Sequence, residues 1–341
     1  MKASSIYTSR ALAWIVLIFI LITAPHFFNS IYWTSLFILI GINILLTCSL
    51  RVIWLTGQIS IGHAGFMLIG AYTSALLVMK GGVSFWLALP ASGVASGVVA
   101  FALAYPYIRV RGIYFVILTV LTAESIRNLA FNWYSLTGGR TGLFGIPGPG
   151  SFSVPFLGNI NFDMLASYYY IVLVVVSISL LLLYLIEKSR YGFTWRAIKE
   201  TSDLAGTVGI NVIWFNAINY VIACFFAGIA GSLFAHFQRT LSAWSTGSFG
   251  VTNCITLLVY MVVGGERRFI GPIVGVLSLT LISEFTRSFE AYQSMFWGGI
   301  GMIIVVAMPE GLVGLPNRIR KWKNRKKGAW VNGQKSISFA E

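Results

Sequence analysis

Glu124 and Arg127 are the sharpest candidates for chemistry, because both lie inside a long apolar run, Ile113–Asn132. Their three-residue spacing places the two side chains on one face of a helix, where a carboxylate and a guanidinium can pair. Such a pair can bind or gate a charged solute, or it can pin helices together. A lone charge at the bilayer centre costs about 2.5–3.5 kcal/mol on insertion scales, and pairing reduces that cost. The sequence favours a structural ion pair, and a solute site stays the alternative.

A glycine-rich stretch, Thr56–Gly65, supplies the second group of candidates. Its glycines disfavour a continuous helix, so we predict an irregular segment that leads into a helix. Non-helical backbone at membrane depth is tolerated only where it is buried in protein or lines a wet cavity. His63 can hydrogen-bond a solute or satisfy free backbone carbonyls, and both interpretations stay open. The candidates for the substrate pathway are Gln58, Ser60, Gly62, His63 and Gly65.

The longest polar stretch apart from one glycine-rich loop is Glu187–Val212, which carries four cations and three acids. Its centre, Trp195–Val208, contains no proline and predicts a short helix. Trp195, Ile198 and the pair Leu204–Ala205 would share one apolar face of that helix. A helix wedged between two spans must lie at the cytoplasmic surface, and its apolar face needs a protein partner or the lipid boundary.

Motifs of the common metal and nucleotide enzymes are absent from the sequence. It contains no His-Glu-x-x-His, no close pair of carboxylates and no Gly-x4-Gly-Lys-Ser/Thr loop. Cys48, Cys224 and Cys254 lie inside apolar runs, at spacings that fit neither a zinc site nor a disulfide framework. We therefore predict no catalytic residue, no metal site and no ATP hydrolysis of the P-loop kind by this chain.

The elements that position these residues follow from composition. The 341 residues are 57% hydrophobic and 10% charged, whereas soluble domains are about 25% charged. Repeated apolar runs near the length of a bilayer span indicate an integral membrane protein. Because no run alternates with period two, we predict an all-α helix bundle. Much of the net charge of +14 lies in the tail 317–341, which favours anchoring to anionic lipid over nucleic-acid binding.

Ten apolar runs predict ten transmembrane helices. The runs are Leu12–Phe28, Ile31–Leu50, Val52–Val78, Phe85–Tyr105, Ile113–Asn132, Ser167–Ile186, Ile213–Phe237, Val251–Val263, Ile270–Phe285 and Met295–Met308. If the N-terminus lies inside, this threading places 19 of the 24 lysines and arginines on the inner side. That asymmetry satisfies the positive-inside rule and predicts that both termini are cytoplasmic.

The domain organisation follows from this threading. Residues 1–316 form the transmembrane domain and 317–341 the basic cytoplasmic tail, with loop 188–211 inside and loop 134–166 outside. Spans two to five and seven to ten are sets of four helices with opposite threading, and glycine-rich segments interrupt both. Inverted repeats with broken helices are typical of transporters, so we predict an inverted repeat.

Several motifs together resemble one family, in family order over roughly residues 30–315. They are Gly57–Phe66, Gly70–Thr73, Arg109–Phe115, Glu124–Arg127, Leu136–Leu143, Gly145–Pro147, Trp195–Lys199, Ala227–Gly231, Gly264–Gly265 and Gly271–Pro272. The chain resembles the membrane permease subunit of branched-chain amino-acid ABC importers, of the LivM type. Any one of these motifs alone would be weak, but the set is specific.

The resemblance implies a role for the polar stretch. ABC permeases carry a cytoplasmic Glu-Ala-Ala-x3-Gly loop that docks in the ATPase. The segment Asp203-Leu-Ala205-x3-Gly209 is similar, with Asp for Glu and Leu for the first Ala. It implies a coupling helix in which Arg196 and Glu200 form the rim of the docking surface. The ATPase-coupling residues would be Trp195, Arg196, Ile198, Glu200, Asp203, Ala205 and Gly209.

The resemblance also implies the rest of the machine. The chain would be a permease subunit of an ATP-driven importer in the bacterial inner membrane, for branched-chain or other hydrophobic amino acids. It would pair with a paralogous permease, bind two ATPase subunits and receive solute from an external binding protein docked at Arg140 and Thr141. This chain would bind no cofactor, and ATP and Mg would sit on the partner subunits. Alternating access would follow from movement of the coupling helix.

Three alternatives stay open at this point. The same machine can carry urea, short amides or another small solute. An ion-coupled secondary transporter can work through Glu124 or Glu284, although the organised cytoplasmic loop speaks against it. A membrane enzyme is the most remote, because no ligand cluster appears in the sequence.

Overall fold

The computed structural model describes residues 30–108, 110, 112–154, 158–161, 164–244, 246–286, 299 and 311–314. The predicted first span, almost all of the predicted tenth span, both termini and the basic tail 317–341 lie outside the described residues, as do Arg109 and Arg111.

Five helices of the described chain are long and apolar enough to cross a membrane. They are α2 (Ile31–Trp54), α4 (Phe85–Ile108), α5 (Ile113–Asn132), α7 (Leu165–Lys188) and α10 (Val212–Gln238). Each coincides with a predicted span, because an uninterrupted apolar run of about 20 residues satisfies all its backbone groups as a helix. The chain is therefore a mostly helical, multi-pass membrane protein.

Three shorter apolar helices complete the bundle. They are α3 (His63–Met79), α12 (Val251–Gly264) and α13 (Gly271–Phe285). They occupy the helical parts of the predicted third, eighth and ninth spans. Residues 55–62, before α3, contain no helix, which confirms an irregular segment followed by a helix. The predicted stretch Thr56–Gly65 ended too late, because α3 already begins at His63.

The second span is longer than predicted. The sequence suggested an end at Leu50, but α2 continues through Arg51 to Trp54. A charged residue was expected to mark the membrane surface. Arg51 instead stays inside the helix because a carboxylate from another helix neutralises it, as described below.

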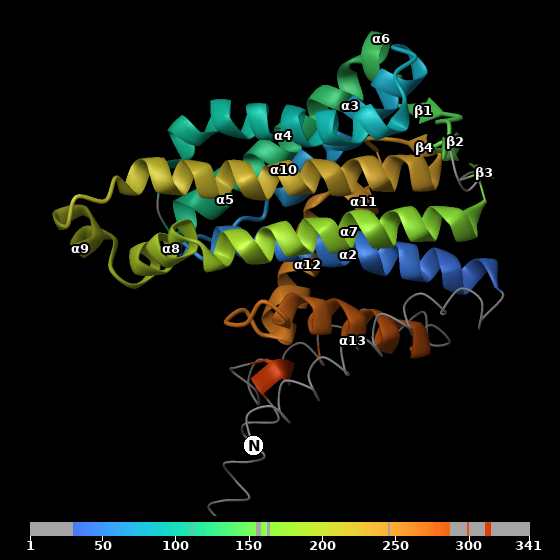
Figure 1. The fold of residues 1–341 in the computed structure, drawn as a ribbon. Helices are drawn as coiled ribbons and strands as arrows, with labels where there is room; N and C mark the ends of the chain where they lie inside the picture. Colours follow the sequence, from blue (N-terminus) through green and yellow to red (C-terminus); the bar gives the residue numbers. More distant parts are fainter. Residues whose placement is uncertain are drawn as a thin grey trace, which may run out of the picture.

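The helices pack around α10, which contacts α2, α3 and α4, while α7 lies along α2 and α13 lies against α12 (Figure 1). Close contact of α3 with α10 depends on glycine. A Cβ atom at Gly70 would meet the backbone of Gly228, and one at Gly231 would meet the backbone of Met67. Small residues let helix backbones approach in this way inside membranes.

The two ends of the bundle differ (Figure 1). One end carries α8 (Arg190–Glu200) and α9 (Ser202–Thr207), and the other carries α6 (Tyr134–Thr137) and four short strands. Strand β1 (Leu143–Phe144) pairs with β4 (Thr240–Leu241), and β2 (Ser151–Val154) pairs with β3 (Gly158–Asn161). The all-α prediction missed these sheets, because strands of two to four residues are too short to show a period in the sequence. Short segments α11 (Thr246–Phe249) and η2 (Leu312–Gly314) complete the described elements.

Candidate functional site

The polar stretch forms two helices where the sequence predicted one over Trp195–Val208. Helix α8 begins after Ser189, whose Oγ accepts a hydrogen bond from the Tyr191 backbone N–H at 3.2 Å. Helix α8 ends before Thr201, whose backbone is extended (φ −153°), and α9 begins at the next residue. The run Thr201-Ser-Asp203 explains the break, because these side chains compete for backbone hydrogen bonds and favour helix ends.

Gly209 closes α9. Its φ of +86° lies in the left-handed region. Its backbone N–H donates to the Gly206 carbonyl, and the Ile210 N–H donates to the Ala205 carbonyl. This is the Schellman arrangement, which favours glycine at its left-handed position. The glycine of the predicted coupling motif therefore ends helix α9. The sequence alone assigned it only to the docking surface.

The predicted docking face is turned inward. Trp195 is 0% exposed, and its Nε1–H donates to the Phe215 carbonyl of α10 at 2.9 Å. Ile198 and Ala205 are also buried within the chain. The apolar face of α8 is covered by the same chain, beside the membrane helix α10. The sequence alone does not reveal this cover. The coupling role of Trp195, Ile198 and Ala205 stays a prediction, but their side chains are not on the surface.

Other side chains form the surface that a partner would meet. The predicted threading places this end inside, so we call five exposed apolar residues of α8, of α9 and its C-cap, and of the start of α10 the cytoplasmic patch: Phe193, Leu204, Val208, Ile213 and Trp214. Val208 is 75% exposed. The predicted rim residues Arg196 and Glu200 are exposed beside this patch, as are Asp203 and Gly209.

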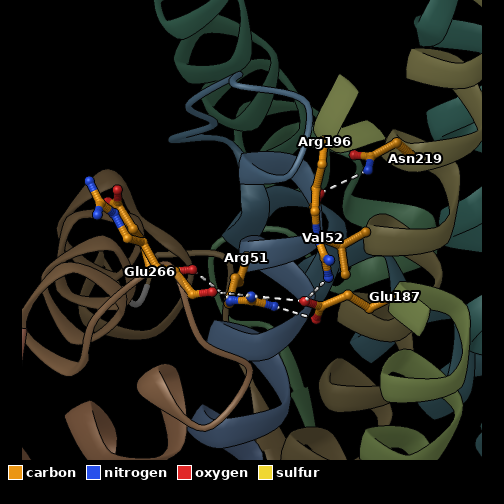
Figure 2. A network of polar contacts seen from close by, with 7 residues as sticks. Arg51, Val52, Glu187, Arg196, Asn219 and Glu266 are labelled. Carbon is orange, nitrogen blue, oxygen red and sulfur yellow. Dashed lines mark hydrogen bonds and ion pairs between the residues drawn. The ribbon is translucent and has the colours of Figure 1, made fainter. Parts of the chain in front are cut away.

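A buried charge network ties α8 to the bundle, and Figure 2 shows it. Both Nη atoms of Arg51 donate to the carboxylate of Glu187, at 2.5 and 3.1 Å. Arg196 of α8 donates to the same carboxylate at 2.7 Å. Arg51 also donates through Nε to the Glu266 carbonyl at 2.8 Å, in the turn between α12 and α13. The three side chains Arg51, Glu187 and Arg196 therefore join α2, α7 and α8, and Arg51 reaches the α12–α13 turn.

Sequence reasoning missed this network. It treated Arg51 and Glu187 as the surface ends of two spans, 136 residues apart in the chain. The usable signal was weak: each apolar run ends in one charge of opposite sign on the same predicted side of the membrane. Buried charges are paired almost without exception, so a predicted pairing was within reach, although its partner was not unique.

A cavity of about 480 Å³ lies between the α8–α9 segment and the irregular segment before α3. Its lining includes Thr56, Gln58, Lys199, Glu200, Asp203 and Asn216. The Lys199 ammonium lies 4.6 Å from the centre of the Trp54 ring. Burial lowers the pKa of Lys199 below its usual value. Of the five predicted pathway residues, Gln58 is the one that lines this cavity.

The other predicted pathway residues lie between helices. Ser60, Gly62, His63 and Gly65 are buried. His63 Nε2 is 2.7 Å from the Ser49 Oγ of α2. A Cβ at Gly62 or Gly65 would meet the backbone of α5, so both glycines set how closely this segment packs on α5. Buried between helices, these residues can support the wall of a pathway. A direct contact with the solute stays a prediction.

At the opposite end, Arg140 and Thr141 are exposed. The Arg140 guanidinium lies 5.8 Å from the Phe131 ring centre and 5.4 Å from that of Trp244. The Thr141 hydroxyl donates to the Gly138 carbonyl at 2.7 Å. These contacts fix the positions of both residues within loop 134–166, where docking of a binding protein stays a prediction.

The predicted contact between Glu124 and Arg127 is present. Arg127 Nη2 lies 2.7 Å from Glu124 Oε2, and Arg127 Nη1 donates to the Ala243 carbonyl at 3.5 Å. Its structural role and the alternative role at a solute site both stay predictions.

Comparisons with known proteins agree with this architecture. The sequence model of a family described as branched-chain amino acid transport system / permease component matches residues 31–308. The high-affinity branched-chain amino acid transport system permease protein LivM of Escherichia coli (strain K12) is 29% identical over 308 residues, covering 85% of this chain and 71% of that protein. LivH of the same organism, a permease protein of the same description, is 25% identical over 303 residues, covering 85% and 94%.

A third relative carries a different name. The guanosine ABC transporter permease protein NupQ of Bacillus subtilis (strain 168) is 27% identical over 286 residues, covering 76% of this chain and 84% of that protein. No solved structure matches the chain at a significant level.

The family match spans most of the sequence, from the first residues of α2 past the end of α13, and it coincides with a bundle of apolar spans. This chain belongs to the family of permease components of branched-chain amino acid transport systems.

Proposed function

We propose that this permease component forms the membrane path of an ATP-driven importer for branched-chain or other hydrophobic amino acids. The observation that carries this proposal is the family match over residues 31–308, which includes all five long apolar helices. Separate subunits would hydrolyse ATP and hold its Mg, and this chain would bind no cofactor. A paralogous permease, two ATPase subunits and an external binding protein would complete the complex. A second permease is supported by the two relatives LivM and LivH, which carry the same transport-system name in one organism.

The proposed threading has ten spans, with both termini in the cytoplasm of a bacterial inner membrane. The distribution of lysine and arginine supports it. In this orientation α8 and α9 face the cytoplasm, while loop 134–166 and its Arg140–Thr141 tip face outward. The domain division at 316 and the inverted repeat belong to the same proposal.

In this complex the cytoplasmic patch docks in the ATPase, with Arg196, Glu200 and Asp203 at its rim. Exposed apolar side chains that cluster in this way mark an interaction site, because burying them in an interface removes them from water. Docking would push on α8 and α9, and the contact of Arg196 with Glu187 would carry that displacement to α2 and α7. Alternating access then requires that the ATP-bound ATPase dimer favours one of two arrangements of the helices.

The test uses the complete complex in proteoliposomes. Val208→Glu places a charge in the cytoplasmic patch, so we expect loss of ATPase assembly and of ATP-dependent leucine uptake while the permease still inserts. The matched control is Ser84→Glu, which adds the same charge at an exposed position just before α4, at the other end of the molecule. Gly209→Arg is less informative, because it also breaks the left-handed helix end. Normal assembly and uptake by Val208→Glu would contradict docking at this patch.

A second candidate solute has one observation in its favour. The relative NupQ is named for guanosine, so the same machine can be built for a nucleoside. Uptake assays with leucine and guanosine in parallel separate the two proposals directly, because only the transported solute accumulates with ATP.

A further inference from the structure

Helix α5 packs less completely than the other long apolar helices, since the smallest share of its residues is buried. Its outward face carries Ile117, Leu121, Ser125 and Asn128, which recur at three- and four-residue steps and are all exposed. This face is therefore apolar in its first half and polar in its second.

The Glu124–Arg127 pair lies on the flank of that face and is open on one side. The Glu124 side chain is 30% exposed and the Arg127 side chain 17%. At 1.5 Å per residue, Glu124 lies roughly 16 Å from the first residue of α5 and roughly 12 Å from the last. A partly exposed ion pair thus sits near the middle of a membrane-spanning helix.

Lipid is a poor cover for this face, because charged groups in the membrane interior normally face protein or a water-filled path. The outward faces of two other spans make the contrast clear. Helix α4 exposes Val94, Val98 and Phe101, and α7 exposes Val174, Ile178 and Leu181, which suit lipid. The outward face of α5 therefore borders the second permease and the path between the two chains.

We propose that Glu124 and Arg127 bind the charged head of the transported α-amino acid on this face. The Glu124 carboxylate accepts from the solute ammonium, and the Arg127 guanidinium donates to the solute carboxylate. Leu121 and Ile117, one and two turns away, contact the apolar side chain of the solute. Between passages the two protein groups neutralise each other across 2.7 Å. This inference rests on the proposed function, because it assumes an amino-acid solute and a second permease.

The first experiment asks whether water reaches the face. Ser125→Cys, in the assembled complex, is treated with a charged, membrane-impermeant methanethiosulfonate reagent. We expect labelling that slows several-fold when leucine is transported. Val98→Cys and Leu181→Cys are the matched controls on lipid-facing positions, and we expect neither to react. The native cysteines that the structure describes are buried, which keeps the background low. A Ser125→Cys thiol as unreactive as the two controls would overturn the proposal.

The second experiment separates a site from a structural pair. The exchange Glu124→Arg with Arg127→Glu keeps an ion pair at the same spacing but reverses its polarity. We expect leucine uptake per ATP to fall at least tenfold while ATPase activity and thermal stability persist, and Arg127→Lys to retain part of the uptake. Unchanged uptake by the exchanged pair would show a structural role alone. If the exchanged protein does not fold, protection of Ser125→Cys by leucine decides.

Different results would overturn the proposed solute and the proposed role of the ion pair. A wild-type complex that takes up no leucine with ATP would overturn the proposed solute. A wild-type complex that takes up leucine, together with an exchanged pair that works normally, would overturn only the role of Glu124 and Arg127.

Discussion

At the residue scale, Arg51 shows how a charge is kept inside a membrane helix. It is 2% exposed, yet each donor group meets an acceptor: the Glu187 carboxylate and the backbone carbonyls of Glu266 and Arg267. Glu187 in turn accepts from Arg196, which is 45% exposed and links the buried pair to the surface. The buried arginine therefore depends on one carboxylate, and that carboxylate is shared with the helix proposed to meet the ATPase.

This dependence predicts that Glu187→Gln is strongly destabilising. Removing one partner of a buried ion pair leaves an uncompensated charge, which costs about 3–5 kcal/mol. The midpoint of thermal unfolding in detergent should fall markedly. Glu200→Gln, on the exposed side of α8, should leave it nearly unchanged. Adding Arg51→Met to Glu187→Gln should recover part of the loss, and no recovery would mean that Glu187 acts through something other than Arg51.

At the element scale, the apolar runs located each of the five long helices in the described part of the chain, because span length and hydropathy are local properties. The bounds of α5 match the prediction, and those of α10 differ by one residue at each end. The direction in which a short polar helix turns its apolar face depends on distant parts of the chain. Trp195 was expected to face a partner, but its ring is buried within the chain and its N–H donates to α10. The sequence shows that α8 has an apolar face, whereas only the packed structure shows what covers it.

The contact of α3 with α10 and α4 supports a prediction about paired glycines. At Gly70 a Cβ atom would collide with the backbone of Gly228, so Gly70→Ala should cost about 1–3 kcal/mol or more through overpacking. At Gly97 of α4 the nearest atom to a Cβ would be 3.7 Å away, an ordinary contact. Gly97→Ala should be neutral or stabilising, by up to about 1 kcal/mol.

Thermal unfolding and the yield of monodisperse detergent-solubilised protein measure both variants. Equal behaviour of Gly70→Ala and Gly97→Ala would show that α3 and α10 do not approach as closely as described.

At the scale of the whole molecule, function requires that two opposite ends communicate. The α8–α9 end, which carries the cytoplasmic patch, lies opposite the small sheets (Figure 1). The Arg51–Glu187–Arg196 network joins α8 to α2 and α7, and Arg140 precedes strand β1. Loop 134–166 is tied to α10 as well: the His236 ring of α10 lies 2.7 Å from the Pro147 carbonyl and 2.9 Å from the Ser74 hydroxyl. Near its other end, α10 accepts the Trp195 hydrogen bond at the Phe215 carbonyl, so this helix links the loop to α8. These links join residues far apart in sequence, so motif and period could not predict them.

The last prediction concerns sidedness, on which every functional role above depends. Thr141→Cys and Val208→Cys place one exposed thiol at each end of the molecule. In intact cells that express each variant, an impermeant maleimide should label Thr141→Cys but reach Val208→Cys only after the membrane that holds the protein is permeabilised. The native Cys48, Cys224 and Cys254 are buried and serve as the unlabelled background. Labelling of Val208→Cys from outside would invert the threading, because the patch would then face the binding protein and the Arg140 loop the ATPase.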